Sequence, residues 1–149
     1  MNMMLRVALS MNRNFKILKI DHVAIAVNSL EETSKIYSLL GMNIGHVENV
    51  IAENVDVLKI HPDSNEHTIE LLEPNNIESS VHKFLNKKGQ GLHHIALEVD
   101  NIYNAIDYLV ENNIQVIYSP PQKGADNKLI TFIHPNCTSG VLIELCQSA

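Results

Sequence analysis

One repeated stretch constrains the fold of this chain more than any other feature of its sequence. Residues 20–30 read IDHVAIAVNSL and residues 92–102 read LHHIALEVDNI, with an offset of 72 residues and no gap. Both copies alternate like a strand and then begin a helix, and both place a histidine, His22 or His94, at the third position. A chain of 149 residues with such a repeat is predicted to contain two similar modules.

The rest of the sequence extends each copy into the same order of elements. Further strands are predicted at 43–50, 53–60 and 68–73 after the first copy, and at 115–118, 128–133 and 141–146 after the second. The predicted fold class is α+β, with two βαβββ modules at about 19–74 and 91–147 and a linking helix at 77–88. Residues 19–149 are expected to form one domain, preceded by an N-terminal extension of residues 1–18, which contains no acidic residue.

Each module is predicted to begin its helix with a capping residue. Ser29 is followed three residues later by Glu32, which is the pattern of a capping box, and Gly41 is suited to end this helix. In the second copy Asn101 stands at the corresponding position and is also a favoured N-cap residue.

Composition and charge exclude two classes of partner. The formal net charge is −6 at pH 7, whereas nucleic-acid binding requires a basic surface. No apolar run has the length needed to cross a membrane. The two cysteines, Cys137 and Cys146, are too few for a disulfide framework and suit a reducing compartment. The sequence therefore describes a globular chain that binds neither nucleic acid nor membrane.

The ends of the two modules repeat as well as their beginnings. The sequence IEL occurs at 69–71 and again at 143–145, and it places Glu70 and Glu144 inside apolar strands. A carboxylate in such a strand is costly to bury unless it is paired or bound to a metal ion. Two glutamates in matching positions therefore point to a shared role.

The two histidines and the two glutamates together predict one metal site. If the modules pair about a pseudo-twofold axis, His22, Glu70, His94 and Glu144 converge. Imidazole and carboxylate ligands suit a divalent first-row ion, with Co²⁺, Mn²⁺, Ni²⁺ and Zn²⁺ as candidates. An octahedral ion with these four ligands would keep two positions for water or substrate and would act as a Lewis acid.

With these residues the chain resembles the vicinal oxygen chelate superfamily and, within it, the methylmalonyl-CoA epimerases. The resemblance extends over about residues 19–147. It is carried by five motifs, which are DHVAIAV at 21–27, IELLEP at 69–74, GLHHIA at 91–96, FIHP at 132–135 and GVLIEL at 140–145.

The resemblance implies a fold and an activity. The two modules would curl one mixed sheet around a metal-binding cavity, and the protein would be a homodimer that takes an acyl-CoA thioester. It would epimerise (2R)- and (2S)-methylmalonyl-CoA by removing the C2 proton and returning it through a metal-stabilised enolate. Co²⁺ is the first of the four candidate ions. The implied compartment is the cytoplasm of a bacterium or the mitochondrial matrix of a eukaryote.

The resemblance also implies catalytic roles. The glutamate that matches Glu144 is both a metal ligand and a proposed base in the family. Some members carry a second catalytic glutamate on the third strand, but an ungapped alignment places Val57 there in this chain. The second acid–base group is therefore Asp56, Glu53 or a water. His93 points away from His94 by strand alternation and is expected to pack or to support the site.

Two other functions share parts of this pattern. A glyoxalase I-type lactoylglutathione lyase uses the same ligand types, so the four residues alone do not separate it from an epimerase. The His93–His94 pair and the His-Pro…Ile-Glu-Leu ending favour the epimerase. The third hypothesis is a metal-free binding module of the same fold, and the presence of all four ligand residues argues against it.

Overall fold

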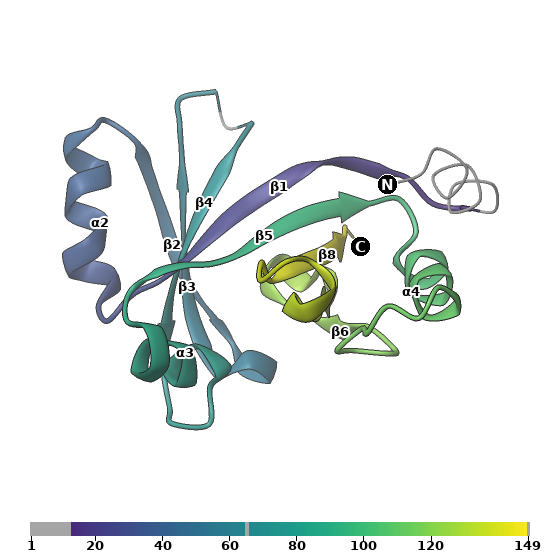
Figure 1. Ribbon diagram of the computed structural model, residues 1–149. Helices are drawn as coiled ribbons and strands as arrows, with labels where there is room; N and C mark the ends of the chain where they lie inside the picture. The colour runs from purple at the N-terminus through teal and green to yellow at the C-terminus, as the bar shows by residue number, and fades with distance from the viewer. Residues whose placement is uncertain (1–12, 65, 149) are drawn as a thin grey trace.

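The computed structural model describes residues 13–64 and 66–148, which include an eight-stranded sheet (Figure 1). The first module contains β1 Ile17–Ala26, α2 Leu30–Leu39, β2 Asn43–Val50, the 3-10 turn η1 Ile51–Glu53, β3 Val55–His61 and β4 Thr68–Pro74. The second contains β5 Gly91–Val99, α4 Ile102–Glu111, β6 Gln122–Lys123, η2 Ala125–Asn127, β7 Leu129–Ile133, η3 Pro135–Cys137 and β8 Ile143–Gln147. The helix α3, Ser80–Lys88, links the two modules.

The two modules have the same strand arrangement and meet at β1 and β5. The strand order is β2-β3-β4-β1-β5-β8-β7-β6. In each module the first and last strands are parallel neighbours, β1 with β4 and β5 with β8, whereas β1 and β5 pair antiparallel. The sheet curls so that the modules face each other (Figure 1). The predicted α+β fold of two paired modules in a curved mixed sheet is confirmed, and the modules pair within one chain.

Each module has its own apolar cluster between the sheet and its helix. On the outer side of the first module, Leu30 of α2 packs with Leu58, Ile60 and Leu71. In the second module the corresponding cluster lies under α4, and its buried members are Phe15, Val99, Ile102, Ala105, Ile106 and Leu145. The opposite, inner face of the sheet carries the functional site.

The predicted N-terminal extension is only partly described. Residues 1–12 lie outside the described residues. Phe15 is buried against the α4 cluster, and β1 already begins at Ile17. The ordered contacts with the domain therefore start a few residues before position 19.

The two N-caps form at the predicted residues. The Ser29 hydroxyl oxygen accepts a hydrogen bond from the backbone N–H of Glu32 at 3.1 Å, and the Asn101 side-chain oxygen accepts one from Asn104 at 3.0 Å. The capping box at Ser29 is only half formed, because the Glu32 carboxylate accepts from the Lys35 ammonium at 2.9 Å instead. The end of α2 also follows the prediction, since Gly41 adopts a φ of +82° that favours glycine.

Three predicted element boundaries are wrong for identifiable reasons. The strand expected from residue 53 starts at Val55, because η1 and the left-handed Asn54 come first. The linking helix starts at Ser80 rather than at 77, since the Ser79 side chain caps it. Residues 115–118 make only an isolated bridge to β7, because Pro120 and Pro121 follow and have no N–H to donate to a ladder.

Candidate active site

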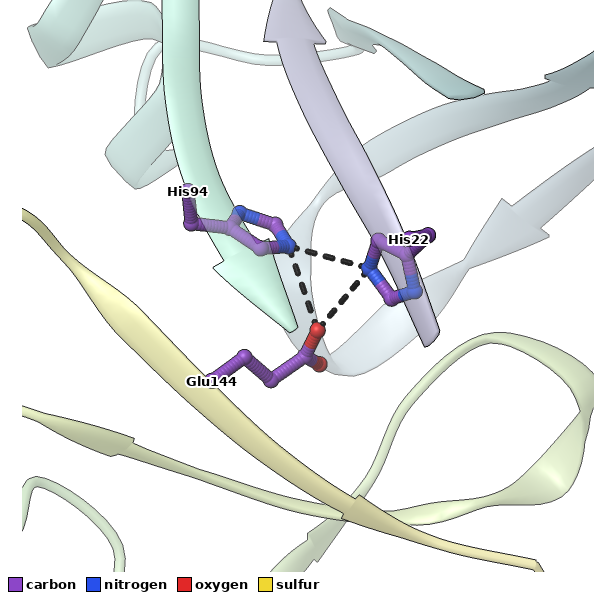
Figure 2. A group of neighbouring side chains, drawn as sticks. All are labelled: His22, His94 and Glu144. Atoms are coloured by element: carbon purple, nitrogen blue, oxygen red, sulfur yellow. Dashed lines mark hydrogen bonds and ion pairs between the residues drawn. The ribbon is translucent and has the colours of Figure 1, made fainter. Parts of the chain in front are cut away.

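The two histidines face each other across the β1–β5 pair, on the inner side of the sheet. In this antiparallel register Ala24 lies opposite His94 and His22 lies opposite Ala96. The imidazole Nε2 atoms of His22 and His94 are 3.2 Å apart, and their side chains are only 9% and 8% exposed (Figure 2). The antiparallel pairing of the repeated strand therefore turns one sequence repeat into a pair of adjacent imidazoles.

The two glutamates reach the same point from the neighbouring strands. Glu70 on β4 lies beside Ala24, and Glu144 on β8 lies beside Ala96. Both alanines are fully buried, and their small side chains leave room for the longer residues next to them. Strand alternation and these small neighbours together bring a buried carboxylate to each histidine.

The distances between the four side chains are those of a compact cluster. His22 Nε2 lies 2.5 Å from Glu70 Oε2 and 3.0 Å from Glu144 Oε2. His94 Nε2 lies 3.1 Å from the same Glu144 oxygen. Figure 2 shows His22, His94 and Glu144 pointing toward one another from three different strands. The structure thus places all four predicted ligand residues together.

The chemistry of this cluster fits a divalent cation. The two Nε2 atoms are 3.2 Å apart, and only one hydrogen fits between them. At least one of the two nitrogens therefore presents a lone pair that could bind a metal ion. Glu144 Oε2 is buried without a hydrogen-bond partner among the described residues, which leaves a negative oxygen to be satisfied. The possible ligand atoms of His22, His94 and Glu144 all lie within 4.8 Å of one another. Glu70 joins this group because its Oε2 atom contacts Nε2 of His22.

Each histidine is also held through its second ring nitrogen. The Nδ1 atom of His22 lies 2.8 Å from Asp21 Oδ2, and Lys128 Nζ donates to both oxygens of Asp21 at 3.1 and 3.2 Å. The Nδ1 atom of His94 lies 2.9 Å from Nδ1 of His93. Such contacts keep the hydrogen on Nδ1 and leave Nε2 as the ligand atom.

Burial and hydrogen bonds shift the pKa values of this cluster in opposite directions. Burial alone would raise the pKa of Glu144, but the adjacent imidazoles of His22 and His94 outweigh it and lower that pKa to about 2. Burial alone would lower the pKa of His22, but the hydrogen bond with Asp21 and the adjacent carboxylates of Glu144 and Glu70 raise it to about 11. The positive charge on the His22 imidazole therefore offsets part of the carboxylate charge around it, and a bound cation would take over this role.

His93 differs from the other histidines of the site. Burial and the nearby His94 lower the pKa of His93 to about 4, so its imidazole is neutral at physiological pH. Its ring packs edge-on against Phe84 at 4.9 Å between ring centroids. Strand alternation predicts that His93 faces away from His94. The register of β1 against β5 shifts at this point, between Ala24 and Ile25, and His93 instead lines the cavity and contacts His94.

The cluster lies in a cavity with mostly apolar walls. The wall residues come from both modules and from α3, and they are Val50, Val55, Val57, Leu72, Val81, Ala125, Ile130 and Phe132. The charged residues that line it include Glu53, Lys59 and Lys128. A cavity of this kind can bind a small acyl group and exclude water from the reacting atoms.

The structure separates the two candidates for the second acid–base group. Val55, Val57 and Lys59 of β3 face the cavity, so Asp56 lies on the opposite side of the strand. The Asp56 carboxylate accepts from the side-chain amides of Asn49 at 2.8 Å and Asn75 at 3.3 Å. The candidate Asp56 is therefore outside the site.

Glu53 lies at the end of η1 and lines the cavity. Its carboxylate oxygen Oε1 accepts a hydrogen bond from the Tyr118 hydroxyl at 2.9 Å. Burial raises the pKa of Glu53, while the Tyr118 hydrogen bond acts in the opposite direction. Tyr118 has no sequence signal that links it to residue 53, because it lies in the irregular segment between α4 and β6.

The chain is similar to a known superfamily and to named enzymes within it. Residues 21–132 match the Glyoxalase/Bleomycin resistance protein/Dioxygenase superfamily. The mitochondrial methylmalonyl-CoA epimerase of Dictyostelium discoideum is 36% identical over 129 residues, which cover 85% of this chain and 76% of that protein. The chain belongs to this superfamily and, within it, to the family of the methylmalonyl-CoA epimerases.

Solved structures support the same relationship. Methylmalonyl-CoA epimerase from Mycobacterium tuberculosis superposes with a TM-score of 0.85 and 30% identity, over 95% of each chain. A variant of the Streptomyces coelicolor methylmalonyl-CoA epimerase in complex with 2-nitronate-propionyl-CoA superposes with a TM-score of 0.83 and 32% identity, over 90% of this chain and 96% of that chain. Among the described residues, no helix has the length and apolarity needed to cross a membrane.

Proposed function

We propose that this protein is a metal-dependent epimerase that interconverts (2R)- and (2S)-methylmalonyl-CoA. The observation that carries the proposal is the convergence of His22, Glu70, His94 and Glu144 in a buried cluster with an apolar cavity beside it. The relationship to the methylmalonyl-CoA epimerases supplies the substrate, an acyl-CoA thioester.

The proposed metal centre consists of the four clustered side chains. The bound ion would supply a positive charge that stabilises the negative charge developing on the thioester oxygen. His22 and His94 would hold it through Nε2, with their Nδ1 atoms oriented by Asp21 and His93. We place Co²⁺ first among the candidates and keep Mn²⁺, Ni²⁺ and Zn²⁺ as alternatives, to be separated by binding titrations of each ion.

Two carboxylates are available to move the C2 proton. Glu144 is a buried carboxylate beside both imidazoles, and it would accept a proton on one face of the substrate. Glu53 lines the same cavity, and burial raises its pKa, which suits a group that must both take and return a proton. We therefore assign Glu144 and Glu53 to opposite faces of C2.

An exchange experiment tests this assignment. Metal-loaded protein is incubated with each methylmalonyl-CoA epimer separately in deuterated water, and both C2 exchange and epimerisation are followed. Wild-type protein should exchange and interconvert both epimers. Glu53→Gln should abolish interconversion but retain exchange from one epimer only, because Glu144 still serves one face. The matched control Asp56→Asn should behave like wild type, since Asp56 lies outside the cavity.

A parallel assay with a second substrate decides between the epimerase and its main alternative. The glyoxalase I hypothesis uses the same ligand types, so the methylglyoxal–glutathione hemithioacetal is assayed in parallel. Turnover of this hemithioacetal without C2 exchange in methylmalonyl-CoA would contradict the epimerase. Full interconversion by Glu53→Gln would instead contradict only the role of Glu53.

We further propose that the protein is a homodimer. Leu18 and Ile20 of β1 are 55% and 61% exposed, and a second copy that covers them would remove apolar surface from water. Light scattering of the purified protein tests the dimer. The compartment that we propose is the cytoplasm in a bacterial cell or the mitochondrial matrix in a eukaryotic one, in line with the mitochondrial relative.

A further inference from the structure

The Tyr118 side chain joins the second module to the candidate acid–base group of the first. Tyr118 lies in the segment between α4 and β6, and its hydroxyl donates to Glu53 Oε1 at 2.9 Å. The two residues are 65 positions apart, so only the pairing of the modules brings them together. This hydrogen bond links Tyr118 to a residue that lines the cavity.

The backbone of Tyr118 is fixed by a buried side chain. The Thr131 hydroxyl donates to the Tyr118 carbonyl at 2.7 Å and accepts from the Tyr118 N–H at 3.2 Å. Thr131 is fully buried in β7. The Tyr118 ring packs edge-on against Phe132, with the ring centroids 5.9 Å apart, and Phe132 in turn contacts His94. The phenol oxygen is thus held at a defined place relative to the cluster.

Glu53 is held by hydrogen bonds at both its backbone and its carboxylate. Its backbone carbonyl accepts a hydrogen bond from the Ser79 hydroxyl at 3.2 Å, and its Oε1 atom accepts from Tyr118. Within residues 13–64 and 66–148, the other oxygen, Oε2, makes no hydrogen bond, so it is available for a substrate proton. Burial first, and then the nearby Glu53, raise the pKa of Tyr118 to about 12, so the phenol remains a donor at physiological pH.

We propose that Tyr118 is a positioning residue that holds one oxygen of Glu53 and thereby directs the other toward C2 of the substrate. The inference rests on the proposed epimerase function and deepens it. Tyr118 would bind neither the substrate nor the ion. It would act only through the carboxylate of Glu53, which predicts an effect confined to one face of the reaction.

The test replaces Tyr118 by Phe, with Tyr103→Phe as the matched control. Tyr103 lies on α4 and is 53% exposed. C2 exchange is measured from each epimer separately in deuterated water. Tyr118→Phe should slow exchange from the epimer that uses Glu53 by roughly tenfold or more, the usual range for a lost hydrogen bond to a charged group. Exchange from the other epimer, metal content and KM should stay close to those of wild type.

A double variant separates positioning from a general structural effect. If Tyr118 acts through Glu53, the combination of Tyr118→Phe with Glu53→Gln should be no slower than Glu53→Gln alone. A further loss in the double variant, or an equal loss of exchange from both epimers in Tyr118→Phe, would overturn the proposal. Unchanged exchange in Tyr118→Phe would overturn it as well. Failure of the proposed function is distinct, because wild-type protein would then exchange neither epimer.

Discussion

The two modules supply the same pair of proposed ligand residues, a histidine and a glutamate, but hold the histidines in different ways. His22 and His94 occupy matching positions of the repeat, and so do the residues before them, Asp21 and His93. In the first module the imidazole contacts an ionised carboxylate, whereas in the second it contacts a neutral imidazole. The duplicated backbone therefore makes the positions of the ligands symmetric, while one flanking residue makes their electronic properties unequal.

The asymmetry extends beyond the flanking residue. Asp21 is bound in turn by Lys128, which comes from the second module, and His22 and Lys128 hold the pKa of Asp21 well below its usual range. His93 packs against Phe84 of α3. A carboxylate partner makes an imidazole a stronger electron donor than a neutral partner does, so His22 should bind a cation more strongly than His94.

A second difference concerns the 3-10 turns. The turn η1 of the first module ends in Glu53, which enters the cavity. The corresponding turn of the second module, η2, carries Asp126 instead, and this carboxylate pairs with Lys59. The proposed second acid–base group thus exists in one module only. In a nearly symmetric fold, this allows the two faces of a substrate to meet different groups.

Removal of either histidine should have the largest effect on metal binding. We expect His22→Ala and His94→Ala each to reduce the metal content of purified protein to background, because either change leaves an incomplete ligand set around a buried carboxylate. Metal analysis by mass spectrometry measures this directly. His46→Ala is the control, since His46 is exposed. A stoichiometric ion in either ligand variant would contradict the four-residue site.

Removal of the supporting residues should have an intermediate and unequal effect. Asp21→Asn should weaken metal binding by about 10–100-fold, the range typical for a lost partner of a ligand histidine. His93→Asn should weaken it less, because a neutral amide replaces a neutral imidazole. Competition with a fluorescent chelator measures both affinities, and Asp63→Asn at an exposed turn serves as the control. Equal losses of metal affinity in the two variants would show that Asp21 and His93 support their histidines equally.

The sequence was sufficient to predict which residues meet at the centre of the sheet. The repeat places His22 and His94 on equivalent strands, and the IEL motifs add Glu70 and Glu144, so module pairing alone brings the four together. The regular offset makes this inference possible without any knowledge of the loops.

The place of Glu53 in the cavity and its contact with Tyr118 could not be predicted in the same way. Strand alternation cannot be counted through η1, where Asn54 is left-handed, so Asp56 and Glu53 looked equivalent in the sequence. Tyr118 reaches Glu53 only because the modules fold onto each other. A contact between two irregular segments leaves no periodic signal, whereas a contact between two regular strands does.

The smallest expected effect compares the two N-caps. Ser29→Ala and Asn101→Ala each remove the side-chain acceptor for one backbone N–H, and loss of such a cap typically costs about 1 kcal/mol. Loss of the α4 cap should lower the free energy of global unfolding, because this helix buries Ile102, Ala105 and Ile106 in the core.

The cap of α2 should act more locally. Leu30 is the buried residue of this helix, so α2 can fray while the rest of the domain stays folded. Ser29→Ala should therefore accelerate hydrogen exchange in α2 and shift the denaturant midpoint less than Asn101→Ala does. Urea titration and hydrogen-exchange mass spectrometry of the two variants measure both quantities. The reverse order of midpoints would mean that α2, despite its exposed surface, belongs to the cooperative core of the first module.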